Sequence, residues 1–197
     1  MPSALTLALI DATAATISTH ADELTSLDRA IGDGDHGSNM QRGFQAIAAQ
    51  REALAELELG DALQKAGMIL VTTVGGASGP LYGSLLMGIG KALKAGKNPA
   101  DACAEGVESV KKRGKSDVGA KTMLDVLVPT LDALRAGAVP DALRQTATAS
   151  REATKPMQAT RGRASFLGER SIGHYDPGAT SSCLLIHAVC DALESRA

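Results

Sequence analysis

Apolar residues recur at helical spacing along almost the whole chain, and the interruptions fall at points rich in glycine and proline. Because residues three and four positions apart share one face of a helix, this pattern predicts amphipathic helices. We predict eight of them. Six span residues 4–25, 38–57, 61–73, 122–134, 141–157 and 178–193, one begins at Pro80, and one begins at Pro99 with Asn98 as its N-cap.

Three apolar segments have a second interpretation as buried parallel strands, namely residues 69–74, 126–128 and 183–186. Each also continues a longer helical pattern, and no alternating run or hairpin turn supports a sheet. The sequence therefore favours an all-α fold over an α/β fold. A length of 197 residues, 44% of them hydrophobic, suits one domain over residues 1–197, or at most two very small ones.

The composition excludes several classes of function. Lys and Arg number 20 against 22 Asp and Glu, so the chain has no basic footprint for nucleic acid. With two Tyr, two Phe and no Trp, aromatic platforms for bases or sugars are nearly excluded, and a ligand must be held by polar loops and aliphatic walls.

The cysteines and the N-terminal residues predict the cellular compartment of the protein. The chain has three cysteines, Cys103, Cys183 and Cys190, and no two of them form a CxxC pair. An odd number without such a pair is typical of free thiols in a reducing compartment. The first residues show no positively charged signal-peptide region, and no apolar window reaches the roughly 20 residues of a membrane span. We expect a soluble, cytoplasmic protein.

The unusual residues fall in alternate connections between the predicted helices. The connections after the first, third, fifth and seventh helices are residues 26–37, 75–79, 114–121 and 158–177, and the others are short turns. In an antiparallel up-and-down bundle, alternate loops emerge at the same end. We therefore predict that one rim of the bundle carries the functional site.

The first of these connections places Asp28, Asp33 and Asp35 within eight residues. A like-charge pair at about 4 Å costs roughly 4 kcal/mol at a protein-surface dielectric, so three converging carboxylates need a cation or must point apart. Oxygen ligands suit Mg²⁺ or Ca²⁺, and the spacing does not fit an EF-hand. A solvated loop that caps the next helix is the equally weighted alternative. His36 alone suggests a hydrogen-bonded structural group, although its neighbours favour a phosphate contact.

The second and third connections each suggest part of a ligand site. Residues 74–80 are rich in glycine and precede a helix, which suits an anion cradle with Ser78 as a donor, or an ordinary tight helix entry. In the third, Gly114-Lys115-Ser116 does not fit a Walker A motif. We expect Lys121 and Thr122 to open a helix near the ligand, with Met123 as an aliphatic wall.

The fourth connection is long for a loop without secondary structure, and long ordered loops are usually functional. Its arginines suit phosphate, and both Phe166 and Tyr175 place scarce aromatic side chains here, which favours function over an ordinary surface loop. The four connections together predict Mg²⁺, two ions for three carboxylates, holding a diphosphate or triphosphate for phosphoryl transfer. The arginines are Arg161, Arg163 and Arg170, with His174 and Asp176 beside them.

Four stretches, residues 27–40, 75–80, 119–125 and 161–180, closely resemble the family of nucleotide-binding L subunits of bacterial dihydroxyacetone kinases. The resemblance implies a closed barrel of eight antiparallel amphipathic helices, with ADP or ATP and two Mg²⁺ at one rim. It implies Asp28, Asp33 and Asp35 as metal ligands. It implies nucleotide contacts from His36, Asn39, Ala77, Ser78, Gly79, Thr122, Met123, Arg170, Asp176 and Gly178.

The resemblance also implies partners, because this family works in split enzymes. A dihydroxyacetone-binding K subunit would receive the phosphoryl group, and a phosphohistidine-carrying M subunit of the phosphotransferase system would recharge bound ADP. A homodimer is a further possibility. The alternatives are an ATP-dependent kinase subunit for another short ketose, a non-catalytic ADP-binding regulator, and a Mg²⁺-dependent hydrolase, for which no water-positioning base is identified.

Overall fold

The computed structural model describes residues 2–195, and within that range every regular element is a helix. The all-α prediction is confirmed, and the strand interpretation of the three apolar segments is wrong. The helices are α1 (Ala4–Thr19), α2 (Ala21–Ile31), α3 (His36–Ala48), α4 (Arg51–Ala55), α5 (Leu59–Thr73), α6 (Ser78–Lys94), α7 (Pro99–Gly114), α8 (Leu124–Arg135), α9 (Pro140–Ala153), the 3-10 helix η1 (Arg163–Ser171) and α10 (Pro177–Glu194).

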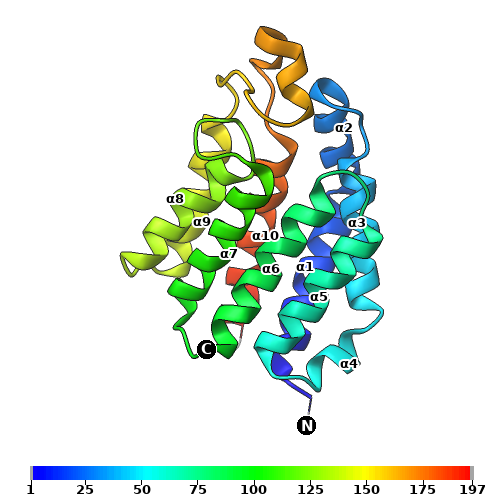
Figure 1. Ribbon diagram of the computed structural model, residues 1–197, viewed down its shortest axis with the longest axis vertical. Coiled ribbons are helices and arrows are strands. Elements are labelled where there is room, and N and C mark those ends of the chain that lie inside the picture. Colours follow the sequence, from blue (N-terminus) through cyan, green and yellow to red (C-terminus); the bar gives the residue numbers. More distant parts are fainter. Residues whose placement is uncertain (1, 196–197) are drawn as a thin grey trace.

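Eight of these helices form a closed ring, in which each packs on the next. Its order is α1, α3, α5, α6, α7, α8, α9 and α10, and α10 returns to α1 (Figure 1). The barrel is therefore as predicted, but the total of eight helices is too low. The two additional α-helices arise because both of the first predicted helices are divided.

The first predicted helix divides at His20, whose backbone (φ −101°, ψ 9°) leaves the helical range while its N–H still bonds to Thr16 O. After this break α2 continues to Ile31, six residues beyond the predicted end. Asp28 therefore lies on a helix and not in a loop, which corrects the prediction. The second predicted helix divides in the same way, because α3 ends at Ala48 and α4 begins at Arg51.

The other helix ends follow the sequence signals closely. Asn98 caps α7 by accepting a hydrogen bond from the Asp101 N–H at 2.9 Å, with Pro99 in the first turn. Asp176 caps α10 in the same way, accepting from the Ala179 N–H at 2.7 Å. Helix α6 begins at Ser78, two residues earlier than predicted, so that the serine lies in the first turn of the helix.

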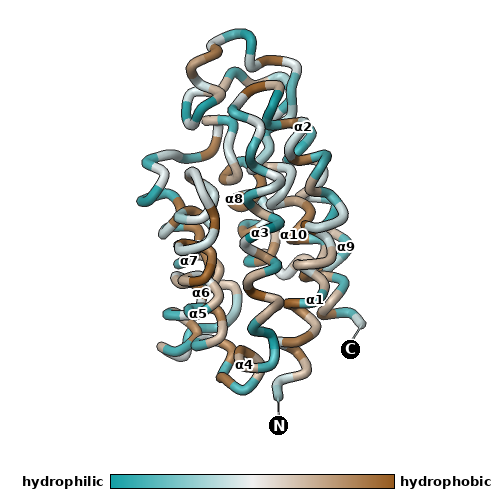
Figure 2. The backbone as a smooth tube through the Cα atoms, turned by 90° about the vertical axis from the view of Figure 1, so that its right-hand side faces the viewer, coloured by the Kyte–Doolittle hydropathy of each residue, from teal (hydrophilic) through white to brown (hydrophobic). Residues whose placement is uncertain are grey.

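The core is aliphatic and relies on close helix contacts. A Cβ atom on Gly83 would lie 2.7 Å from the Gly67 carbonyl oxygen, so α5 and α6 approach at a distance that only glycine permits. Hydrophilic residues gather in the loops beyond α2, at the end of the barrel opposite the N-terminus (Figure 2). None of the described helices is long and apolar enough to cross a bilayer. The fully buried core side chains include Ile17, Leu24, Ile31, Met40, Leu54, Leu70 and Leu124.

Candidate functional site

All four predicted rim connections contribute residues to one cavity of about 170 Å³. The parity argument is thereby confirmed, since segments far apart in sequence meet at the same end of the barrel. Most of the predicted site residues line this cavity. They are Asp28, Asp33, Asp35, His36, Ala77, Ser78, Thr122, Met123, Asp176 and Gly178, whereas Asn39, Gly79 and Arg170 do not line it.

Three carboxylates converge at one wall of the cavity. Asp28, Asp33 and Asp35 each offer an oxygen atom, and these three atoms lie within 4.8 Å of one another. Asp28 is buried, whereas Asp33 is open to solvent and pairs with Arg163 through Oδ2 and Nε at 2.9 Å. Hard, anionic oxygen ligands at this separation fit a magnesium or calcium ion.

Local backbone geometry explains why these carboxylates come together. Asp28 Oδ2 accepts hydrogen bonds from the backbone N–H groups of Asp35, at 2.9 Å, and His36, at 3.1 Å, and so folds the loop back onto α2. A Cβ atom on Gly32 would lie 2.1 Å from Asp28 Oδ1, and Gly34 has φ +74°. The glycines of this loop are therefore required by the turn that assembles the carboxylates.

Another part of the cavity wall is the first turn of α6, where backbone N–H groups have no partner within the helix. Ala77 and Ser78 line the cavity there, which fits an anion cradle. Gly79 is buried, and a Cβ atom on it would lie 2.6 Å from the Val74 carbonyl oxygen. A glycine is therefore needed at this position because the start of α6 packs closely against the preceding residues.

His36 connects the carboxylate wall to the anion cradle. Its ring is buried, with Nδ1 2.9 Å from Ser78 Oγ and Nε2 2.9 Å from Ser181 Oγ. Burial lowers the pKa of His36, although the nearby Asp28 and Asp35 act in the opposite direction. Both ring nitrogens therefore have protein partners, and the imidazole supports Ser78 from behind.

Two polar residues of this region were not identified from the sequence, Ser181 and Tyr82. The Tyr82 hydroxyl lies 2.7 Å from Ser181 Oγ and 2.8 Å from Ser182 Oγ, and burial raises its pKa to about 12. The available signal was a tyrosine within an apolar helix of a chain that has only two tyrosines. A buried Tyr hydroxyl needs a polar partner.

Asn39 lies just outside the cavity, and its side chain is held by Arg42. The Arg42 guanidinium donates to Asn39 Oδ1 through Nη2 and to the Thr73 carbonyl through Nε at 2.9 Å. The amide oxygen of Asn39 is therefore engaged. A Cβ atom on Gly76, which has φ +65°, would lie 4.0 Å from Asn39 Nδ2.

Three buried charged residues interact near the start of α8, namely Lys121, Asp125 and Asp176. Lys121 is 1% exposed, has φ +60°, and donates from Nζ to the carbonyls of Met157 at 3.0 Å and Ser171 at 2.5 Å. Its ammonium therefore ties the last connection to the barrel, and Lys121 also lines the cavity. Asp125 accepts from the backbone N–H of Thr122 at 2.6 Å, and burial raises the pKa of Asp176 to about 7.

The last connection is not a structureless loop, because it contains η1. Arg161 and Arg163 line the cavity, but Arg170 is exposed and does not. Tyr175 does not line the cavity, and its hydroxyl donates to Glu152 Oε2 at 2.5 Å. Phe166 is 88% exposed at the outer surface of η1.

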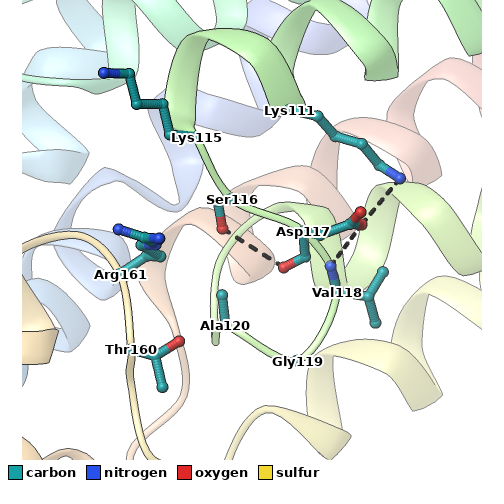
Figure 3. A pocket seen from close by; sticks show the side chains of 9 residues that line it. All are labelled: Lys111, Lys115, Ser116, Asp117, Val118, Gly119, Ala120, Thr160 and Arg161. Atoms are coloured by element: carbon teal, nitrogen blue, oxygen red, sulfur yellow. Dashed lines mark hydrogen bonds and ion pairs between the residues drawn. The ribbon is translucent and has the colours of Figure 1, made fainter.

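A second, more open hollow of about 520 Å³ adjoins the first, and Arg161 lines both. Figure 3 shows the loop of residues 115–120 on one side of it, with Thr160 and Arg161 on the other. Lys111 contributes a further cation, which pairs with Asp117 at 2.9 Å. No aromatic side chain lines this hollow, in agreement with the composition.

Comparison with known proteins identifies related sequences. The model of the DAK2 domain matches residues 30–191. The chain is 46% identical over 170 residues to the ADP-binding subunit DhaL of PEP-dependent dihydroxyacetone kinase 1 from Listeria innocua, covering 84% of each chain. It is 44% identical over 177 residues to the corresponding PEP-dependent subunit of Escherichia coli, covering 83% of this chain and 84% of the relative.

A solved structure supports the same assignment. The dihydroxyacetone kinase from C. freundii, in complex with AMP-PNP and Mg²⁺, matches with a TM-score of 0.84 and 28% sequence identity. The match covers 97% of this chain but 34% of the solved chain, so this chain corresponds to about a third of that kinase. From the fold, the extent of the domain match and the identity to these subunits, the chain belongs to the DAK2 domain family.

Proposed function

We propose that this chain is the ADP-binding subunit of a split dihydroxyacetone kinase. In this proposal a phosphohistidine-carrying M subunit phosphorylates bound ADP, and the phosphoryl group passes to dihydroxyacetone held on a K subunit. The relatives described above are named as PEP-dependent subunits of such a kinase. The whole of residues 1–197 would act as a single nucleotide-binding domain in the cytoplasm.

The observation that carries the proposal is that three carboxylates and an anion cradle line the same small cavity. Carboxylates alone would repel a phosphate chain, and a cradle alone would bind any anion. Together they fit an anion that arrives with divalent cations. Asp28, Asp33 and Asp35 would hold two Mg²⁺, and the metal would neutralise phosphate charge there.

The residues of the chain itself would bind and orient the nucleotide. Ser78 and the first N–H groups of α6 face the position of the phosphates, and Arg163 neutralises charge beside Asp33. Thr122 and Met123 form the wall on the side of the second hollow. The nucleoside would extend from this wall toward that hollow, where aliphatic groups and Arg161 replace aromatic stacking.

The rim also offers a surface for partners. Phe166 and Ile172, which are 88% and 44% exposed, lie on or beside η1, the element whose Arg163 reaches the cavity. A large exposed aromatic side chain beside a polar site is typical of a protein contact. The K and M subunits would approach the open cavity from this side, and a homodimer, if formed, would have to leave it free.

Reconstitution tests the proposal directly. Native mass spectrometry of the purified chain should show a mass increment of ADP plus two Mg²⁺. With the K subunit, dihydroxyacetone and the phosphorylated M subunit, dihydroxyacetone phosphate should form without added ATP. Transfer that requires free ATP would support the exchanging kinase, binding without transfer would support a regulator, and phosphate release from ATP by this chain alone would support a hydrolase.

A further inference from the structure

A chain of four polar side chains, from Tyr82 through Ser181 and His36 to Ser78, leads to the cavity, and Ser182 is a further partner of Tyr82. Ser182 lies 2.8 Å from the Tyr82 hydroxyl, Tyr82 lies 2.7 Å from Ser181, and Ser181 and Ser78 each lie 2.9 Å from one ring nitrogen of His36. Four of these side chains are at most 8% exposed, namely Ser182, Tyr82, Ser181 and His36, and Ser78 opens into the cavity. The Ser78 hydroxyl is therefore connected through His36 to Ser181, which does not line the cavity.

The hydrogen atoms of these hydroxyl and imidazole groups can be placed in two arrangements when Tyr82 donates to Ser181. In the first, Ser181 donates to the Gly178 carbonyl at 3.1 Å, His36 donates from Nε2 to Ser181, and Ser78 donates to the bare Nδ1. In the second, Ser181 donates to Nε2, His36 donates from Nδ1 to Ser78, and the Ser78 hydrogen is free to point into the cavity. In both, Tyr82 donates to Ser181 at 2.7 Å in preference to the Gly178 carbonyl, which lies 3.2 Å from its hydroxyl.

The ligand distinguishes the two arrangements, because ionised phosphate oxygens only accept hydrogen bonds. In the first arrangement Ser78 presents a lone pair to the anion, which is repulsive. In the second it presents a donor. We propose that anion binding at Ser78 converts His36 from its Nε2–H to its Nδ1–H tautomer, and that Ser181, held by Tyr82, is the positioning residue that permits the change.

The two arrangements hold the same number of protons. One proton leaves Nε2 and one joins Nδ1, by exchange with water, and the Ser181 hydroxyl turns from the Gly178 carbonyl to Nε2. The inference rests on the proposed function, because it requires a phosphate at Ser78. It adds a role for Tyr82 and Ser181, neither of which lies among the metal or nucleotide contacts expected from the sequence.

The test is ring ¹⁵N NMR of His36 with and without saturating Mg²⁺ and ADP, since the two ring shifts report the tautomer directly. Replacement of His20, His174 and His187 by Gln assigns their signals, and leaves the fourth of the four histidines as His36. We expect Nε2–H in the free protein and Nδ1–H in the complex. Retention of Nε2–H in a saturated complex would overturn the relay and leave the nucleotide assignment intact.

Two adjacent serines supply a matched pair of variants. Ser181→Ala removes the partner of Nε2, and should weaken ADP binding by about five- to tenfold with loss of the tautomer change, the range expected for one hydrogen bond. Ser182→Ala removes a Tyr82 contact of similar burial without touching His36, and should change affinity less than twofold. Equal effects of the two variants would show a merely structural role. Failure of the wild-type chain to bind ADP with Mg²⁺ would overturn the proposed function and the relay together.

Discussion

The carboxylate cluster should destabilise the protein whenever no cation is bound. Two unit charges 4.8 Å apart repel by about 0.9 kcal/mol in bulk water and about 3.5 kcal/mol at an effective dielectric near 20. Asp35 faces two such neighbours within that distance, Asp28 and Asp33, and Arg163 offsets part of the charge of Asp33. Replacement of Asp35 by Asn removes this repulsion and keeps the shape of the side chain.

Asp35→Asn should therefore stabilise the metal-free protein and weaken its response to ligand. The helix dipole at the start of α3 favours a carboxylate by about 0.3–1 kcal/mol. Subtracting this loss from the relieved repulsion of two neighbours, about 0.9 kcal/mol each in bulk water, leaves a net increase of about 1 kcal/mol in the free energy of unfolding. That gain corresponds to a Tm increase of about 2–4 °C in EDTA at low ionic strength. With Mg²⁺ and ADP at 100 times the Kd, the wild type should gain about 2.7 kcal/mol, most of which the variant loses.

Thermal unfolding in EDTA and in saturating Mg²⁺ and ADP measures both effects. Asp35→Asn should have the higher Tm in EDTA, and the wild type should have the higher Tm with Mg²⁺ and ADP. Asp22→Asn is the control, because Asp22 occupies the first turn of α2 without a carboxylate cluster and should cost about 0.3–1 kcal/mol in both conditions. A lower Tm for Asp35→Asn in EDTA, or an undiminished ligand shift, would refute the repulsion argument.

Two further predictions concern packing and pH. Gly83→Ala should destabilise the protein by about 1–3 kcal/mol in urea titrations, since its Cβ would lie 2.7 Å from the Gly67 carbonyl and 2.5 Å from Val71 Cγ2. Gly114→Ala is the control, because its Cβ would lie 3.4 Å from the nearest atom, Leu81 Cδ2. It should leave the urea midpoint unchanged or slightly raised. Burial raises the pKa of Asp176 to about 7, so this group should lower the free energy of unfolding by about 1.4 kcal/mol per pH unit as pH rises from 4 to 7. Asp176→Asn keeps the helix cap and should remove that slope between pH 5 and 7; an identical slope in both proteins would contradict the assignment.

The helical periodicity and the caps at Asn98 and Asp176 could be read from the sequence because they depend on residues within one or two turns. The same is true of the rim, since the parity of the connections follows from the order of the helices. The break at His20 could not be predicted, because no glycine or proline marks it. Asp28 was misplaced for a separate reason, because the predicted helix ended at residue 25 whereas α2 continues to Ile31.

The role of Lys121 shows a different limit. The sequence predicted that Lys121 opens a helix near the ligand, and Lys121 does line the cavity. The fold also brings the carbonyls of Met157 and Ser171, 36 and 50 residues away along the chain, to its ammonium. A buried ammonium that satisfies two carbonyls acts as a tie between segments. Such a partner set has no local signature.

Residue patterns along the chain were enough to predict an all-helical bundle with a polar rim, because helix formation, capping and turn chemistry depend on near neighbours, and the closed barrel was implied by the resemblance to a known family. The pairing of polar groups at that rim depends on the closed fold. His36 reaches Ser78 over 42 residues and Ser181 over 145 residues, and Tyr82 reaches Ser181 over 99. Hydrogen bonds of this kind depend on distances that exist only once the barrel has closed, and their strength comes from the exclusion of water by its core.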